Sequence, residues 1–488
     1  MNAGTDTLWL DSLADRLGPQ GLWRPGRAPS EAQWHAHMQD WRGRYEGQAC
    51  AIARPATVDD VSWVVRACAA QGVSIVPQGG NTGLVGGGTP DPTGRQLLLS
   101  LQRLDRIRAL DADNLSLTLE AGCTLARAQA AAADAGLLFP LSLASEGSCT
   151  IGGNLATNAG GTQVLRYGTA RELCLGLEVV TADGSCWSGL SGLRKNNTGY
   201  DLRDLFIGSE GTLGIITAAT VRLYPQPTGR ATALVSCASL NDAMALLNRC
   251  RRRLDSGLTG FEVMAALPLA LLGHHRPADA SPLAPLREPG RDSTLPPWVV
   301  LIEHLSPHSQ LQADSDLEQV LADALGAGEV GQAALAHTAQ QRAAFWRVRE
   351  SVPLAEKAEG WMVKHDIAVP TSAIPAFTER TGALISDHHP GARVVCFGHL
   401  GDGNLHYNVQ PPDGHRDGDA LLAFERAING LVFDQVQAFG GTISAEHGIG
   451  QLRRDELARR GDPTGLALMR AIRQALDPHG VFNPGRVI

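Results

Sequence analysis

The sequence predicts an α+β protein with more than one domain, and three observations support this prediction. A short strand, a helix that begins after Thr57 and a second strand follow one another across residues 51–77, which is the pattern of a βαβ unit. Strand-like and helix-like segments alternate again across residues 231–325, in an order typical of a split βαβ layer. The chain has 488 residues, which is enough for two or three domains with substantial cores.

Composition limits the classes of protein to consider. Apolar residues make up 43% of the chain and charged residues 19%, and the formal net charge is -8. This acidic balance argues against a nucleic-acid partner, because the chain offers no broad cationic surface that could displace counterions. No run approaches the roughly 18 apolar residues of a membrane span, and the first residues lack a signal-peptide pattern, so we expect no membrane span. Nine cysteines without a Cys-x-x-Cys pair indicate free thiols and a cytoplasmic location.

The remaining segments give a coarse map of the chain. Residues 1–50 have apolar positions at helical spacing, so we expect a helical extension packed on the outside of a domain. The stretch 276–297 is rich in proline, alanine and charge, which predicts an exposed loop. Periodicity predicts helices over 338–360 and 466–476, and alternation predicts a strand over 361–370.

Glycine is unusually frequent, at 55 of 488 residues, and the excess is concentrated in clusters at 77–88, 147–161 and 208–217. Small residues let a ligand approach the backbone closely, and successive backbone N–H groups can bind a phosphate. The first cluster has neither the dinucleotide fingerprint nor the ATP phosphate loop, which argues against a nicotinamide or ATP site. Each cluster alone could be a structural turn, but three of them indicate the walls of one extended pocket.

Two histidines flank the turn-forming sequence Gly401-Asp402-Gly403-Asn404, which predicts a hairpin. If Leu400 and Leu405 flank a four-residue loop, His399 and His406 form a directly opposed cross-strand pair. Their Cβ atoms would then lie about 5 Å apart, so that both imidazoles could share a divalent metal.

Three further residues extend this candidate site. Asn408 lies two residues beyond His406 and points to the same face of the strand. Glu446 and His447 are adjacent and project in different directions, so Glu446 can join the metal while His447 faces a substrate. Two histidines and one carboxylate leave open coordination positions, as in a catalytic site; zinc suits this set, and Mn²⁺ or Fe²⁺ is also compatible. A polar turn with hydrogen-bonded histidines is the alternative.

Six motifs occur together in the order of a known family. They are the clusters 77–88 and 147–161, Glu210-Gly211-Thr212-Leu213-Gly214, the two histidines around the turn, Glu446-His447, and Phe482-Asn483-Pro484-Gly485. From about residue 50 to its end, the chain resembles the FAD-linked D-2-hydroxyacid dehydrogenases of the vanillyl-alcohol-oxidase superfamily. The resemblance implies an FAD-binding domain of two α+β subdomains over 51–227, an α+β substrate-binding cap over 228–395, and a partly helical C-terminal region over 396–488 that contacts the flavin.

The resemblance also implies where FAD binds. Some relatives attach FAD covalently through a histidine in the first glycine loop, whereas this loop has Asn81, so we expect noncovalent FAD. The backbone N–H groups of residues 79–83 are expected to bind the pyrophosphate. The residues expected to contact the cofactor are Pro77, Gly79, Gly80, Asn81, Thr82, Gly83, Leu84, Pro140, Gly147, Ser148, Ile151, Gly152, Gly153, Asn154, Thr157, Asn158, Gly160, Gly161, Tyr167, Gly168, Glu210, Gly211, Gly214, Ile215, Ile216 and Asn404.

The segment from Arg349 to Lys364 resembles the D-2-hydroxyglutarate branch, in which the matching cations hold a substrate carboxylate. Two cations favour a dicarboxylate substrate. Pro353 departs from that branch, which commonly has a hydroxyl-bearing residue there, so D-malate or a longer 2-hydroxydiacid stays open as the substrate. D-lactate and glycolate are the other substrates within the family. The implied roles are a general base for His447, binding of the α-carboxylate for Asn408, and hydride transfer to flavin N5.

An electron-transfer flavoprotein or a quinone is the expected electron acceptor, and a homodimer is one assembly to consider. Two other classes of function stay open on the sequence. One is a metal-dependent hydrolase, in which His399, His406 and Glu446 activate water and the glycine clusters are only turns. The other is a noncatalytic flavin-binding subunit of a larger complex.

Overall fold

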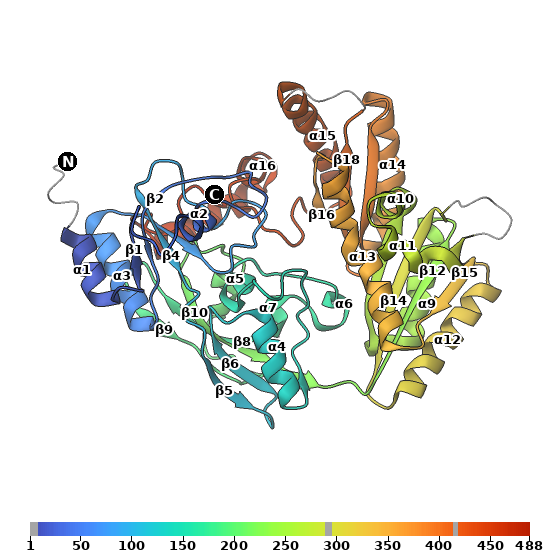
Figure 1. The fold of residues 1–488 in the computed structure, drawn as a ribbon, viewed down its shortest axis with the longest axis horizontal. Coiled ribbons are helices and arrows are strands. Elements are labelled where there is room, and N and C mark those ends of the chain that lie inside the picture. Colours follow the sequence, from blue (N-terminus) through green and yellow to red (C-terminus); the bar gives the residue numbers. More distant parts are fainter. Residues whose placement is uncertain (1–7, 288–294, 413–417) are drawn as a thin grey trace. The chain divides into compact units, whose positions relative to one another are not determined.

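Two compact units make up the chain (Figure 1). The computed structural model describes residues 8–287, 295–412 and 418–488. Unit 1 comprises the described residues of Met1–Gly161, Gly168–Gln226 and Glu446–Ile488, and unit 2 comprises those of Thr162–Tyr167 and Pro227–Ala445. Among the helices of these described stretches, none is both long and apolar enough to cross a lipid bilayer. Each of the nine cysteines is a free thiol.

Unit 1 contains two main sheets. The first has the strand order β1-β2-β4-β3, in which β1 is antiparallel to β2 and the other pairs are parallel. Its strands are β1 (Leu22–Trp23), β2 (Ala49–Ala53), β3 (Ile75–Gln78) and β4 (Gln96–Ser100). The second sheet is antiparallel with the order β5-β6-β10-β8-β9. Its strands are β5 (Ile107–Asp111), β6 (Ser116–Glu120), β8 (Cys174–Val180), β9 (Cys186–Ser188) and β10 (Ile215–Arg222).

Smaller elements complete unit 1. Strands β7 (Leu137–Leu138) and β11 (Tyr224–Pro225) form an antiparallel pair. The helices are α1 (Leu8–Leu17), α2 (Glu31–Met38), α3 (Val58–Gln71), α4 (Leu125–Asp134), α5 (Ile151–Ala156), α7 (Ala170–Leu173), α8 (Arg203–Phe206), α16 (Arg454–Arg460) and α17 (Pro463–Leu476). The predicted N-terminal extension thus holds helices, but it also adds β1 to the first sheet.

Helix α3 follows from local sequence signals. Thr57 is its N-cap, and the side chain accepts a hydrogen bond from the Asp60 N–H at 3.2 Å. Gly72 ends the helix with a φ of 63°, a left-handed conformation that glycine adopts without strain. Because β2 precedes this helix and β3 follows it in the same sheet, the predicted βαβ unit over 51–77 is confirmed.

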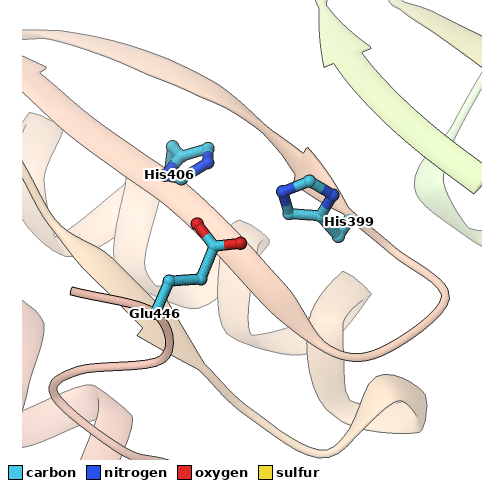
Figure 2. Close-up of side chains that lie close together, drawn as sticks. All are labelled: His399, His406 and Glu446. Atoms are coloured by element: carbon cyan, nitrogen blue, oxygen red, sulfur yellow. The ribbon is translucent and has the colours of Figure 1, made fainter. Parts of the chain in front are cut away.

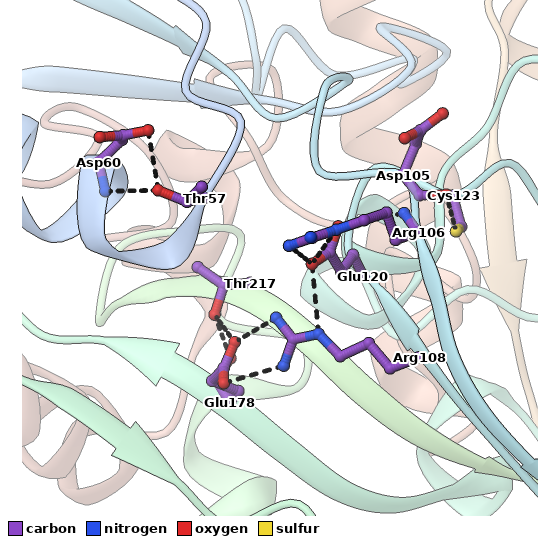
Figure 3. A network of polar contacts seen from close by, with 9 residues as sticks. All are labelled: Thr57, Asp60, Asp105, Arg106, Arg108, Glu120, Cys123, Glu178 and Thr217. Atoms are coloured by element: carbon purple, nitrogen blue, oxygen red, sulfur yellow. Dashed lines mark hydrogen bonds and ion pairs between the residues drawn. The ribbon is translucent and has the colours of Figure 1, made fainter. Parts of the chain in front are cut away.

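A network of ion pairs connects four strands of the second sheet (Figure 3). The buried Glu120 carboxylate accepts hydrogen bonds from Arg106 at 2.9 Å and from Arg108 at 3.2 Å. Arg108 also donates two hydrogen bonds of 3.0 Å to Glu178. At a β-bulge in β10, Thr217 Oγ1 donates a further bond of 2.9 Å to Glu178. These donors satisfy the oxygens of two carboxylates within the sheet.

The C-terminal segment 446–488 returns to the first sheet of unit 1. The Ile75 N–H of β3 donates to the Val481 carbonyl at 2.7 Å. The side-chain amide of Asn483 donates to the carbonyl of Gly87 at 3.0 Å and to that of Glu210 at 2.8 Å. The tail therefore joins the first glycine cluster to the third.

Unit 2 is a seven-stranded antiparallel sheet with helices on both faces (Figure 1). The strand order is β15-β12-β14-β13-β17-β18-β16. The strands are β12 (Gly229–Cys237), β13 (Leu258–Ala265), β14 (Trp298–Ser306), β15 (Gln332–Leu335), β16 (Asp366–Ala368), β17 (Arg393–His399) and β18 (Asn404–Gln410). The helices are α6 (Val164–Tyr167), α9 (Leu240–Leu254), α10 (Ala266–His275), α11 (Pro277–Ala280), α12 (Gln310–Gly326), α13 (Ala339–Glu359), α14 (Ile374–His388) and α15 (Gly418–Ala438).

Alternation along the strands separates the two faces of this sheet. On β18, Leu405 and Tyr407 pack in the core that includes α9, α12, α14 and α15. His406 and Asn408 lie between and beyond them, on the opposite face, where α10 and α13 pack against β17. The α13 face therefore receives the polar side chains of the candidate site.

Several sequence predictions for this unit are confirmed and one is wrong. The predicted helix over 338–360 is α13, whereas the strand over 361–370 is reduced to β16. The stretch 276–297 is not an exposed loop in its first half, because α11 and a 3-10 helix, Ser281–Leu286, bury Leu283 and Leu286 against α10 and α13. These helical turns are too short to show a helical period in the sequence, because prolines separate their apolar residues. Residues 288–294 of that prediction lie outside the described residues.

The predicted domain limits stay predictions. The ranges of the two units show at which residues the chain leaves one unit and enters the other. Strands β17 and β18 complete the sheet of unit 2, although the sequence prediction grouped most of them with the C-terminal region over 396–488. From Glu446 onward the chain belongs to unit 1. The region 396–488 is therefore shared between the units.

Candidate functional site

Unit 1 contains an open cavity that encloses about 970 Å³, which we call the cofactor cavity. Segments of all three glycine clusters line it, together with Asp40 from the N-terminal extension and His447 from the C-terminal segment. The clusters are separated in the sequence, and the two sheets of unit 1 bring them to one place.

The first glycine loop is closely packed at Gly80 and borders open space at Gly83. A Cβ atom on Gly80 would lie 1.9 Å from the carbonyl oxygen of Ser148, which belongs to the second cluster. A Cβ atom on Gly83 would meet no protein atom within 4 Å. Gly80 is therefore required for packing of one cluster on another, whereas Gly83 borders the cavity itself.

The N-terminal extension holds this loop in place. The side-chain amide of Asn81 donates to the carbonyls of Ala36 at 2.9 Å and Gln39 at 2.8 Å, at the end of α2. The Gln78 amide donates to the His37 carbonyl at 3.0 Å and to the Gly88 carbonyl at 2.9 Å. Asn81 thus uses its side chain to attach the loop to α2.

The second cluster contains α5, and Gly152 and Asn158 have different structural roles in it. A Cβ atom on Gly152 would lie 2.6 Å from the Cβ of Ala121, so this residue allows α5 to approach the second sheet. The side-chain oxygen of Asn158 accepts hydrogen bonds from Thr169 Oγ1 at 2.8 Å and from the Arg171 N–H at 3.0 Å. Asn158 therefore orders the turn before α7.

The predicted cofactor residues fall into two groups. Those that line the cofactor cavity are Pro77, Gly79, Gly80, Asn81, Thr82, Gly83, Gly152, Gly153, Asn154, Thr157, Glu210, Gly211, Gly214, Ile215 and Ile216. Those that do not line it are Leu84, Pro140, Gly147, Ser148, Ile151, Asn158, Gly160, Gly161, Tyr167, Gly168 and Asn404. Asn404 and Tyr167 belong to unit 2.

Several residues of the cavity wall were not among the predicted contacts, including Asp40, Thr89 and Leu101. Asp40 is buried, and its carboxylate accepts a hydrogen bond of 2.7 Å from the Tyr45 N–H. Neither Asp40 nor Leu101 lies in one of the three glycine clusters, so the pattern that revealed the clusters could not reveal these residues.

The hairpin of unit 2 has a different register from the prediction. His399 pairs with Asn404, and His406 pairs with Phe397, so the two histidines are diagonal neighbours on one face instead of directly opposed. The loop covers residues 400–403, because Leu400 is buried in the core and the Asp402 carboxylate accepts a hydrogen bond from the Asn404 N–H at 3.1 Å.

The histidines nevertheless remain close. Their ring centroids are 5.7 Å apart, and a ring nitrogen of each lies within 4.8 Å of one of the other. Figure 2 shows both rings projecting from the two strands of the hairpin, and it also draws Glu446. Glu446 is the first residue of unit 1 after Ala445, whose N–H donates to the Asp366 carbonyl of β16 at 3.3 Å.

A buried carboxylate on β13 orders His399 and Arg349. Glu262 accepts a hydrogen bond from His399 Nδ1 at 2.7 Å and one from Arg349 Nε at 2.8 Å. Burial raises the pKa of Glu262, but the charges of His399 and Arg349 outweigh this effect and hold the pKa below its usual range. When Nδ1 of His399 carries the proton donated to Glu262, Nε2 holds the lone pair, which is the form that binds a metal; Arg349 Nη2 lies 3.4 Å from the same Nε2.

A second buried carboxylate orders Lys364 and Asn408. Glu356 lies on α13, two turns after Arg349, and accepts hydrogen bonds from Lys364 Nζ at 3.0 Å and from the Asn408 amide at 2.7 Å. The Asn408 side-chain oxygen accepts the His365 N–H at 3.0 Å. We call this group the polar face of unit 2; its members are Glu262, Arg349, Glu356, Lys364, His399, His406 and Asn408.

Sequence reasoning missed Glu262 and Glu356, although both are almost completely buried. The available signal was an acid at an apolar position: Glu262 interrupts the strand Leu258–Ala265, and Glu356 lies on the buried side of α13. A buried acid normally needs a cationic partner, so this pattern could have shown that each acid has one, although not which residue it is. Asn404 is likewise engaged within unit 2, where its amide donates to Asp366 Oδ1 at 3.0 Å.

The cofactor cavity fits a group of the size and charge of FAD. Glycines are frequent in its wall, and a Cβ on Gly83 would meet no protein atom within 4 Å, so this residue borders open space. Backbone N–H groups of such loops suit a pyrophosphate. Flavin chemistry would be supplied by the cofactor, and the chain's contribution is to bind and orient it.

Comparisons with known proteins agree with this fit. A family profile described as an FAD binding domain matches residues 49–188, and one described as the C-terminal domain of FAD linked oxidases matches residues 226–487. The chain is 38% identical over 450 residues to the D-2-hydroxyglutarate dehydrogenase of Xanthomonas citri pv. viticola, covering 92% of this chain and 91% of that protein. It is 34% identical over 489 residues to the D-2-hydroxyglutarate dehydrogenase of Stutzerimonas stutzeri, covering 99% of each. The mitochondrial D-2-hydroxyglutarate dehydrogenase of Danio rerio is 36% identical over 454 residues, covering 92% of this chain and 80% of that protein.

Solved structures support the fold. p-Cresol methylhydroxylase with substrate bound matches with a TM-score of 0.77 at 17% identity, covering 100% of this chain and 97% of that chain. Alkyldihydroxyacetonephosphate synthase matches with a TM-score of 0.75 at 18% identity, covering 98% of this chain and 85% of that chain. The predicted α+β class, the family and the FAD-dependent oxidoreductase class are confirmed. The chain therefore belongs to the FAD-linked oxidase family, in the group that contains the D-2-hydroxyglutarate dehydrogenases.

Proposed function

We propose that this chain oxidises D-2-hydroxyglutarate to the corresponding 2-oxoacid, with noncovalently bound FAD. The observation that carries the proposal is the position of His447 in the wall of the cofactor cavity, because a proton acceptor is then available beside the cofactor. Similarity to proteins named D-2-hydroxyglutarate dehydrogenase over most of the chain supports the choice of substrate. A metal-dependent hydrolase is not retained, since the family is flavin-linked.

Oxidation of a 2-hydroxyacid removes a hydroxyl proton and a hydride from the α-carbon. Bound FAD would supply the hydride acceptor, at its N5 atom. His447 is the proposed general base for the hydroxyl proton, since general-base catalysis requires a group within hydrogen-bond reach of that proton.

A hydroxyl group is too weakly acidic for a neutral imidazole to ionise it unaided. A divalent metal, most simply Zn²⁺, would supply the missing acidity as a Lewis acid. His399, His406 and Glu446 are the proposed ligands. Support comes from the Glu262 carboxylate on His399, because metal-binding histidines usually donate their second ring N–H to such a partner. Ala445, the residue before Glu446, donates its N–H to the Asp366 carbonyl of β16.

Selectivity for a diacid is assigned to Arg349 and Lys364. The structure adds that each cation already has a buried carboxylate partner, Glu262 or Glu356. These acids neutralise the cations before substrate binds, so each cation would have to share its charge between an internal acid and a substrate carboxylate. Lys364 is the more accessible of the two, with 31% of its side chain exposed against 8% for Arg349. We therefore propose Lys364 as the main contact of the distal carboxylate, with Arg349 as its second cation, and Asn408 as the group that binds the α-carboxylate.

An anaerobic titration tests this proposal. D-2-Hydroxyglutarate, D-malate, D-lactate and glycolate are added in turn to the purified holoenzyme, and the flavin absorbance near ~450 nm is followed. We expect D-2-hydroxyglutarate to bleach this band fastest, with L-2-hydroxyglutarate as the control for the configuration of the α-carbon. His447→Ala should keep its flavin yet reduce it on the order of 10²-fold more slowly. A flavin band that no 2-hydroxyacid bleaches would instead identify a noncatalytic flavin-binding subunit.

Three assignments from the sequence stay predictions. An electron-transfer flavoprotein or a quinone is the proposed electron acceptor, and steady-state assays with each acceptor class distinguish them. A homodimer is tested by light scattering of the purified protein. A cytoplasmic location is proposed from the free cysteines, whereas some of the similar proteins are named as mitochondrial.

A further inference from the structure

Glu210 is a buried acid in the third glycine cluster, and its side chain lines the cofactor cavity. Its backbone has a φ of 52°, a left-handed conformation that is uncommon for a residue with a side chain. Such a conformation persists only where the surroundings hold it, and it often marks a functional position.

Two backbone hydrogen bonds hold Glu210 in this conformation. Its N–H donates to the Ala156 carbonyl at the end of α5 at 2.8 Å, and its carbonyl accepts the Asn483 amide at 2.8 Å. The main chain of Glu210 is therefore attached to the second glycine cluster and to the C-terminal tail. Its side chain extends from a fixed point.

The carboxylate of Glu210 holds the turn that follows His447. One oxygen accepts the Ile449 N–H at 2.6 Å, and the other accepts the Gly450 N–H at 2.7 Å. These amides lie two and three residues after His447. Gly448, between them and His447, has a φ of 81°, and a Cβ there would lie 2.8 Å from the same carboxylate. The turn thus packs directly on the acid.

We propose that Glu210 is a positioning residue for His447: its carboxylate fixes the turn 448–450 and so sets the place of the imidazole in the cofactor cavity. The proposal rests on the proposed function, in which His447 accepts the substrate proton. Proton transfer is sensitive to position, because a displacement of about 1 Å in a catalytic group can cost on the order of 10²-fold in rate.

The chain contains a matched control for this contact. Asp477 is a buried acid of unit 1 that also binds two consecutive backbone N–H groups, from Val481 at 2.9 Å and Phe482 at 2.7 Å. It does not line the cofactor cavity. Glu210→Gln and Asp477→Asn therefore make the same chemical change, in which one acceptor oxygen becomes an NH₂ group that faces a backbone N–H.

The first measurement is amide hydrogen exchange in the flavin-loaded protein. In Glu210→Gln, we expect the amides of Ile449 and Gly450 to exchange at least about 10-fold faster than in the unmodified protein, because one of two hydrogen bonds is lost. Asp477→Asn should leave them unchanged. Equal protection in Glu210→Gln and the unmodified protein would overturn the proposal. Gly448→Ala, which presses a methyl group on the carboxylate, serves as the second variant if Glu210→Gln fails to fold.

The second measurement is a double-mutant cycle on the rate of flavin reduction. Glu210→Gln alone should lower kcat by about 10- to 100-fold with KM nearly unchanged and flavin retained, whereas Asp477→Asn should not. In a His447→Ala background, Glu210→Gln should add less than about a 2-fold loss, because the residue acts through His447. Additive losses would assign Glu210 a role that does not pass through His447 and would reject the proposal. If His447→Ala leaves the rate unchanged, the proposed base fails, and the exchange experiment still decides whether Glu210 holds the turn.

Discussion

The cofactor cavity of unit 1 and the polar face of unit 2 are built in different ways. Glycines of all three clusters are frequent in the cavity wall, at positions such as Gly80 where a Cβ would collide with a neighbouring carbonyl. The polar face consists of side chains, whose charges are balanced by the buried acids Glu262 and Glu356. Substitutions in the glycine-rich wall should prevent cofactor binding by adding atoms to it. Substitutions in the polar face should instead act by removing one partner of an ion pair.

The largest effect is expected from a side chain added to the first glycine loop. In Gly80→Val, the new Cβ would lie 1.9 Å from the Ser148 oxygen, so the first and second clusters must separate. We expect colourless protein with no detectable flavin. The measurement is the ratio of flavin to protein absorbance after purification.

Gly83→Ala separates the two uses of glycine in this loop. Its Cβ meets no protein atom within 4 Å, so the free energy of unfolding without flavin should change little. Weaker flavin binding in this variant would show that the ligand fills the space beside Gly83. Full flavin occupancy in Gly80→Val would contradict a cavity built by close backbone packing.

The metal proposal gives the next largest effect, in unit 2. His399→Ala should lose a bound divalent ion, and Glu262→Gln, which leaves both proposed histidine ligands in place, should weaken metal binding by about 10- to 100-fold. Metal content is measured by elemental analysis of the purified protein. His275→Ala is the control, because His275 pairs with Glu359 outside the polar face. Stoichiometric metal in His399→Ala, together with unchanged turnover, would remove the metal from the proposed mechanism.

The same difference in construction decides what could be predicted from the sequence. Glycine clusters are a local signal, so the segments that form the cavity wall could be predicted, although Leu84 was predicted to line it and does not, and Gln78 and Val85 line it without having been predicted. The polar face depends on pairings between distant residues, such as Glu262 with Arg349, and a single sequence does not show these. Register is another nonlocal property: the turn around Asp402 was recognised, but the burial of Leu400 shifted the pairing of His399 and His406.

A smaller effect is expected in the ion-pair network of unit 1 (Figure 3). Arg108→Met keeps the apolar stem but removes the guanidinium that bridges Glu120 and Glu178. We expect the free energy of unfolding to fall by about 2 kcal/mol, between the small value of an exposed pair and the larger value of a buried one. The control is Arg127→Met, which breaks the exposed pair with Asp105 and should cost under about 1 kcal/mol. Equal losses in the two variants, measured by urea unfolding, would show that burial of the acids does not matter.

The smallest effect is a difference in pH dependence between two buried glutamates of unit 1. Burial raises the pKa of Glu120, but its bonds to Arg106 and Arg108 outweigh this, and the pKa lies below its ordinary value. Burial likewise raises the pKa of Glu210, where the only opposing contacts are the Ile449 and Gly450 amides, and this pKa reaches about 7. The pKa of Glu120, which has cationic partners, is therefore lowered, whereas the pKa of Glu210, which has neutral partners, is raised.

The sign of the effect on stability follows from which state binds more protons. Below pH 4.5, its usual pKa, Glu210 is protonated in both the folded and the unfolded protein. Between pH 4.5 and about 7 the folded protein binds more protons than the unfolded protein. The stabilisation from protonated Glu210 is therefore lost as pH rises through 7. Glu120 contributes stability above pH 4.5 and loses it as pH falls through its folded pKa. In urea unfolding with excess FAD at pH 5 to 8, the slope due to Glu210 cannot exceed about 1.4 kcal/mol per pH unit. Glu210→Gln should remove this slope, whereas Glu120→Gln should keep it and lower stability throughout. An identical pH profile in Glu210→Gln and the unmodified protein would mean that the two amides keep Glu210 ionised across this range.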